Sequence, residues 1–264
     1  MLLLLVLVAA LFTAVAQPVA AQGARWAEAR CDIKPGHYLV NSGLLYLKSA
    51  TNTRFEDQKQ KDLRDALRVL NQAITTGDQA ENPAAWYYLG RYYVLMDDPA
   101  GADTALARAE TLKPECTDDI AAWRRIMWVP ILNAGIAAWQ ANNTDSAISA
   151  FRRANAILQT EPQGFKYLAS LLFNKGQRDS AAYYFRRTAD IAARDTGYAQ
   201  DRKDALFNLA RIEHSQQHWP EAEATYREYL TLYPNDAEVQ ASLGSVLIRR
   251  GRRDSALAIY RQII

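Results

Sequence analysis

The chain has 264 residues and is nearly balanced in charge, with 31 Lys and Arg against 29 Asp and Glu and a formal net charge of +2. Both signs are mixed along the chain, which does not suggest a protein that binds nucleic acid or another polyanion. The length exceeds that of the usual single globular domain, yet no second domain is visible in the sequence.

Residues 1–21 have the pattern of a secretory signal peptide. An almost unbroken apolar run from Leu2 to Ala16 is followed by Pro18 and by small residues that end at Ala21. We therefore expect cleavage after Ala21 and a periplasmic or secreted protein with no integral membrane segment after that cleavage. An uncleaved signal that anchors the chain in a membrane is the alternative, although the run is short of the roughly 20 apolar residues that a bilayer span needs.

Cys31 and Cys116 are the only two cysteines of the chain. An even count in an exported chain predicts a disulfide bond. Cys31 lies in a short N-terminal segment, residues 22–36, and Cys116 follows the second of the helix pairs described below. Two free thiols are the alternative, because a whole helix pair separates the two positions and geometry can forbid the bond.

The clearest helical pattern lies at residues 83–116. Four residues share one face of a first helix, namely Trp86, Leu89, Gly90 and Tyr93. Asp98 and Pro99 are a start signal for a second helix. Its apolar face holds Ala102, Leu106 and Ala109, and Pro114 stops it.

The same marks recur along the chain. In five successive units, a small residue on a first helix is followed twelve positions later by an alanine on a second helix. The pairs are Gly90 and Ala102, Gly135 and Ala147, Ala169 and Ala181, Ala210 and Ala222, and Gly244 and Ala256. A weaker first unit precedes them, with Gly43 and Ala66. The letters repeat as well, because TDSAISAF at 144–151 returns as RDSAAYYF at 178–185 and RDSALAIY at 253–260.

Two insertions interrupt the repeat. Residues 117–128 precede the third unit, contain Trp123, and are expected to lengthen the first helix of that unit. Residues 194–202 are polar and carry Gly197, so they predict a longer loop between the fourth and fifth units.

The pattern W-x2-L-G-x2-Y, followed by spaced apolar residues and a closing Pro, resembles the tetratricopeptide repeat, a helix-turn-helix unit of about 34 residues. The resemblance implies an all-α fold, a right-handed α-solenoid of about six such repeats over residues 37–264. The expected units are 37–78, 83–116, 128–161, 162–195, 203–236 and an incomplete 237–264. Because the sequence stops within a second helix at two isoleucines, we expect a fragment of a longer protein.

The resemblance also implies a function. In this family the first helices line a concave groove that holds a peptide or a partner protein, so we expect a non-catalytic interaction scaffold or adaptor. An accessory subunit or fragment of a larger cell-envelope assembly or export protein is the alternative. Carried onto this sequence, the groove positions include Tyr87, Arg91, Ile136, Trp139, Lys166, Phe173, Phe207, Arg211 and His214. For Ile136 and Trp139, burial in a packed core is the alternative.

No catalytic or cofactor motif is found in the sequence. It contains no G-x-S-x-G, no phosphate-binding loop and no Rossmann glycine pattern. His214 and His218 lie four residues apart, but a zinc site needs three or four ligands and no further Cys or His lies near them. We therefore expect no enzyme activity, no cofactor and no metal.

Overall fold

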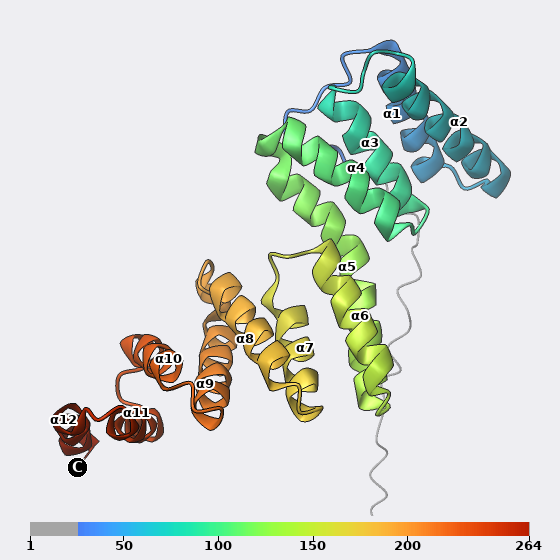
Figure 1. The fold of residues 1–264 in the computed structure, drawn as a ribbon. Coiled ribbons are helices and arrows are strands. Elements are labelled where there is room, and N and C mark those ends of the chain that lie inside the picture. The colour runs from blue at the N-terminus through green and yellow to red at the C-terminus, as the bar shows by residue number, and fades with distance from the viewer. Residues whose placement is uncertain (1–25, 264) are drawn as a thin grey trace, which may run out of the picture.

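The computed structural model describes residues 26–263, so the predicted signal peptide at residues 1–21 lies outside the described part. Within that part the chain forms twelve α-helices and two short 3-10 helices (Figure 1). Their bounds are α1 (Tyr38–Asn52), α2 (Glu56–Thr75), α3 (Pro83–Leu95), α4 (Pro99–Leu112), η1 (Pro114–Cys116), α5 (Thr117–Gln140), α6 (Thr144–Ile157), α7 (Pro162–Asn174), α8 (Arg178–Ala192), η2 (Thr196–Tyr198), α9 (Ala199–Ser215), α10 (Trp219–Leu232), α11 (Ala237–Arg249) and α12 (Arg253–Ile263).

Consecutive helices pack as pairs, from α1 with α2 to α11 with α12, and each pair also contacts the next. The six pairs correspond to the six expected units and follow one another in a curved array (Figure 1). The predicted all-α, repeated helix-turn-helix architecture is therefore confirmed. Between residues 26 and 263, no helix combines the length and the apolar character that a membrane crossing requires.

The turn inside each unit repeats a backbone conformation as well as a sequence pattern. In the second to sixth units, one residue between the paired helices has a positive φ: Asp97, Asn142, Gly176, Gln217 and Gly251. Left-handed backbone ends the first helix and lets the chain reverse within a few residues. The first unit turns differently, because its cap, Thr53, has an extended backbone.

Close approach of the paired helices explains the recurring small residue. A Cβ atom on Gly90 would lie 2.6 Å from the Leu106 side chain, and one on Gly135 would lie 2.6 Å from the Phe151 ring. The equivalent residues of the fourth and fifth units, Ala169 and Ala210, are fully buried. Glycine or alanine is needed here because a larger side chain would push the second helix away.

The long helix α5 joins two apolar cores. Ile120, in its first turn, belongs to the core of the first two units, whereas Met127 and Trp128 belong to the core that continues through the later units. Residues 117–128 thus lengthen the first helix of the third unit, as expected. The loop expected at residues 194–202 is shorter than predicted, because η2 and the start of α9 at Ala199 occupy most of it.

Candidate binding groove

The N-terminal segment, residues 26–36, lies across the first helices of units one and two. The Trp26 amide donates a hydrogen bond to Asn52 Oδ1 on α1 at 3.1 Å, and Glu28 pairs with Lys48 Nζ on α1 at 2.7 Å. At the other end of the segment, Asn82 Nδ2, which caps α3, donates to the Pro35 carbonyl at 2.8 Å. The segment is therefore held against α1 and against the start of α3.

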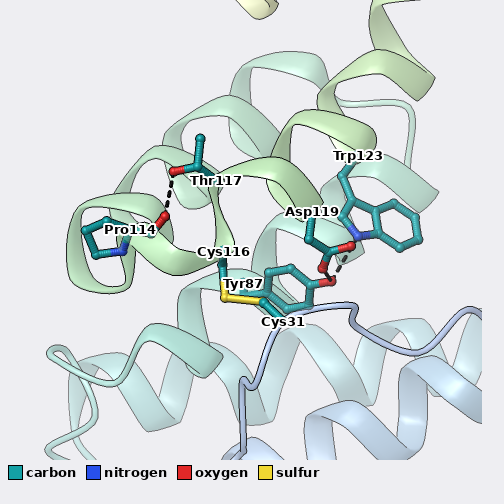
Figure 2. Close-up of a disulfide and its surroundings, with 7 residues drawn as sticks. All are labelled: Cys31, Tyr87, Pro114, Cys116, Thr117, Asp119 and Trp123. Carbon is teal, nitrogen blue, oxygen red and sulfur yellow. Dashed lines mark hydrogen bonds between the residues drawn. A yellow bond between two sulfur atoms is a disulfide. The ribbon is translucent and has the colours of Figure 1, made fainter.

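A disulfide bond fixes this segment in place. The Sγ atoms of Cys31 and Cys116 are 2.08 Å apart and the two Cα atoms 5.3 Å apart, which confirms the predicted pair. Cys116 is buried directly before α5. Figure 2 shows the bridge joining the N-terminal segment to the start of α5, close to Tyr87. Although the helix pairs of units one and two lie between Cys31 and Cys116 in the sequence, the two residues meet because the N-terminal segment folds back across the array.

Arg91 on α3 is enclosed by aromatic rings. Its Cζ atom lies 3.5 Å from the centroid of Trp26, 4.0 Å from that of Trp123 and 5.8 Å from that of Tyr87. The side chain is buried, only 2% exposed, and this burial lowers the pKa of its guanidinium. Its Nε and Nη1 atoms have no hydrogen-bond partner among the described residues. Cation–π contact with two tryptophans therefore stabilises the guanidinium, and the nearby charge of Asp119 adds to it.

Tyr87, one helical turn before Arg91, is buried in the same cluster of side chains. Its hydroxyl donates to Asp119 Oδ2 at 2.5 Å and accepts from Trp123 Nε1 at 2.9 Å (Figure 2). Burial, together with the bond to Asp119, raises the pKa of Tyr87 well above its ordinary value.

Two of the predicted groove residues thus need correction. Tyr87 and Arg91 are buried and do not face solvent. The sequence pattern placed them on the inner face but did not reveal Trp26 and Trp123, the two side chains that cover them. Trp26 lies outside the repeats, and Trp123 lies in the extension of α5; no repeat position predicts either contact.

The central positions belong to the packed interior more than to a groove. Trp139 is partly buried, and its ring lies 6.0 Å from Tyr167 on α7 and 6.5 Å from Phe151 on α6. Ile136 is also partly buried and packs against the same core. The alternative of a packed core therefore describes these two residues better.

The remaining predicted residues lie on α7 and α9, two first helices that contact each other. Phe173 is 44% exposed and Arg211 is exposed, while Phe207 and His214 are half-buried. The Arg211 Cζ atom lies 5.3 Å from the centroid of the Phe207 ring. Lys166 forms an ion pair with Asp201 of α9, so its charge is already engaged. Phe173 and Arg211 are therefore accessible to solvent.

His214 is held beside the same surface without a metal. Its Nδ1 lies 3.3 Å from the Tyr226 hydroxyl, and its ring packs 5.5 Å from Trp219. Burial, together with the positive charge of Arg249, lowers the pKa of His214. No group of three or more His, Cys, Asp or Glu side chains is placed to hold a metal ion anywhere in the described range.

Comparison with known proteins gives one family and several distant structures. The sequence model of the tetratricopeptide repeat matches residues 57–115, 168–237 and 216–264. Among solved structures, MamA is 18% identical over 66% of this chain and 92% of its own, with a TM-score of 0.42. YrrB, described as a TPR protein with an unusual peptide-binding site, is 15% identical over 74% and 90%, with a TM-score of 0.40. Pseudomonas aeruginosa pilF is 14% identical over 85% and 88%, with a TM-score of 0.40.

Proposed function

The chain belongs to the tetratricopeptide repeat family, and from this premise we propose that it is a non-catalytic scaffold that binds a peptide or partner protein in its concave groove. The fold is typical of protein–protein interaction. Repeat arrays share one architecture across many tasks, so the site must come from the residues of this chain and not from the fold.

The observation that carries the proposal is the unequal covering of the groove. In units one and two, the N-terminal segment and Trp123 fill it. In units four and five, Phe173 and Arg211 are exposed and Phe207 is half-buried. Aromatic and arginine side chains are the types that most often dominate binding energy at interfaces. The groove between α7 and α9 is therefore the proposed binding surface.

A hollow in the surface lies elsewhere in the array. It is lined by residues of α10, α11 and α12 and of the connection after α10, including Leu230, Pro234, Leu243 and Ile259. It contains none of the groove residues of α7 and α9. We assign the function to the groove because its exposed residues include an aromatic ring beside a cation, whereas the lining of this hollow contains Arg227 but no aromatic side chain.

Site-specific photo-crosslinking in extracts of the source cell tests the groove. A photoreactive amino acid at position 173 or 211 is expected to crosslink to one discrete protein, identified by mass spectrometry. The matched control position is 183, because Tyr183 is 60% exposed but lies on the second helix α8. Crosslinks of equal yield from position 183, or none from the groove positions, would contradict the proposal.

We also propose that the protein works in an oxidising compartment, the periplasm or the cell exterior. The Cys31–Cys116 bond supports this, since disulfides persist there and are rare in the cytosol. The apolar N-terminal run supports export. A thiol-reactive mass tag applied during cell lysis should leave the native protein unlabelled and should add two tags after reduction. Full labelling without reduction would contradict the proposed compartment.

A further inference from the structure

Units two and five carry the same pair of side chains at the same repeat positions. An aromatic residue lies three positions before the small residue and an arginine one position after it: Tyr87 and Arg91 around Gly90, Phe207 and Arg211 around Ala210. In both units the arginine lies over the ring of its neighbour, with Cζ-to-centroid distances of 5.8 Å and 5.3 Å. The two sites are internal copies of one another.

Only the copy in unit two is covered. There, Trp26 closes over the Arg91 guanidinium at 3.5 Å and Trp123 at 4.0 Å. In unit five, Phe207 is the one ring found over the Arg211 guanidinium among residues 26–263. Arg211 is consequently exposed, whereas Arg91 is only 2% exposed.

The helix lengths explain why unit five stays open. Trp123 comes from the extension of α5, which begins at Thr117, eighteen residues before Gly135. The first helix of the next unit after Arg211, α11, begins at Ala237, only seven residues before Gly244. It therefore has no turn that reaches back over the arginine. The residues equivalent to Arg211 in the flanking units, Ser170 and Ser245, are small and partly exposed, which leaves space beside the guanidinium.

We propose that Arg211, stacked on Phe207, accepts an aromatic side chain from an extended segment of a partner protein, as Arg91 accepts Trp26. The inference rests on the proposed function, because it names what the groove binds. Tryptophan fits best, since its ring has the strongest cation–π attraction and its area is large. An extended segment fits because residues 26–36, the segment that fills the covered copy, contain no helix or strand.

Selection of peptides from a random phage-displayed library on the oxidised protein tests the inference. The selected peptides are expected to share an invariant Trp, or another aromatic residue, flanked by variable positions. Calorimetric titration then measures their affinity for three proteins: the unaltered chain, Arg211→Ala, and Arg152→Ala as an exposed-arginine control on α6. We expect Arg211→Ala to weaken binding by roughly 3- to 30-fold. The control should change nothing.

A double-mutant cycle makes the assignment specific. Replacing the peptide aromatic residue by Ala should weaken binding to the unaltered chain, and the same replacement should cost little more once Arg211 is Ala. Additive losses would contradict a direct contact. The variants concern an exposed side chain, and circular dichroism confirms that each remains folded.

The outcomes separate this inference from the proposed function. Peptides without an invariant aromatic residue, or peptides that lose affinity in Phe173→Ala but not in Arg211→Ala, overturn the aromatic acceptor and leave the groove function standing. A selection that yields no binder also overturns the acceptor, and the crosslinking experiment then decides whether the groove function fails with it. Self-association that is abolished by Trp26→Ala would replace the partner protein by a second copy of the chain.

Discussion

Units two and five show how one pair of residues becomes core in one place and surface in another. Tyr87 and Arg91 are buried, whereas Arg211 at the equivalent position is exposed. The repeats themselves are alike at these positions. The difference comes from two parts outside the repeat pattern, the N-terminal segment and the extension of α5. A groove position is therefore open or closed according to what the flanking chain places over it.

The covered site also has a structural role. A buried guanidinium is costly unless its surroundings compensate it, and here two tryptophan faces do so together with the nearby charge of Asp119. Trp26 comes from the N-terminal segment, Arg91 from α3 and Trp123 from α5. The sandwich thus ties the segment to two successive first helices.

The largest expected loss of stability comes from breaking the disulfide bond that holds the N-terminal segment over unit two. Cys31→Ser with Cys116→Ser removes a crosslink over 85 residues, which the chain-entropy relation values at about 4 to 5 kcal/mol. Chemical denaturation should show most of this loss, and hydrogen exchange should place it in α1 to α4. The unaltered chain under reducing conditions should behave the same way. Equal protection of α1 to α4 in both forms would contradict the assigned role of the bond.

The next largest effect is expected from Trp26→Ala, a substitution designed to open the covered site. Trp26→Ala removes a partly buried ring and its cation–π contact, for an expected loss of about 2 kcal/mol. It leaves the disulfide in place and uncovers Arg91 where Trp26 lay, while Trp123 stays in contact with the guanidinium. If the two sites are copies, calorimetry with a selected aromatic peptide should then find two binding sites per chain in place of one. Trp26→Phe is the control and should keep one site; an unchanged stoichiometry in Trp26→Ala would show that the sites are not equivalent.

A smaller change in stability is expected from exchanging the two equivalent aromatic residues, Tyr87 and Phe207. Tyr87→Phe makes unit two resemble unit five and leaves the buried Asp119 carboxylate without its hydroxyl donor, for an expected loss of about 1 to 2 kcal/mol. The reverse change, Phe207→Tyr, adds a hydroxyl at a half-buried site and should change stability by less than about 0.5 kcal/mol. Denaturation midpoints of both variants measure the contrast. Equal losses would contradict the difference in burial.

The sequence alone predicts the helix pairs and the disulfide, but not which groove positions are covered. The reason is physical. The helix pairs were predictable because the Gly90–Leu106 contact follows from local spacing. The disulfide was predictable from the cysteine count. The covering of Arg91 was not, because it depends on where an irregular segment folds back, and no periodicity encodes that. The disulfide prediction did contain a clue, since joining Cys31 to Cys116 requires residues 26–36 to cross the intervening unit.

The smallest expected effect is a pH dependence of local stability that should occur at the open site, near His214, and not at the covered site. The pKa of His214 is lowered by burial and by the charge of Arg249, so the unfolded chain binds a proton there more readily than the folded chain. Stability from this group is therefore fully present above the unfolded pKa of about 6.5 and is lost as the pH falls toward the folded value. The region around α9 should lose hydrogen-exchange protection between pH 8 and 5.

The covered site provides the reference for this last experiment. Tyr87 does not ionise in that range, because the ordinary tyrosine pKa of about 10 is raised further by burial and by Asp119. Tyr87 should therefore add no pH dependence of its own to the protection of α3. His214→Gln should flatten the pH dependence of α9 alone. Comparing this variant with the unaltered chain also separates His214 from its neighbour Glu213, whose burial raises its pKa and gives the opposite slope. Parallel profiles for the two proteins would show that His214 contributes nothing to the difference between the open and the covered site.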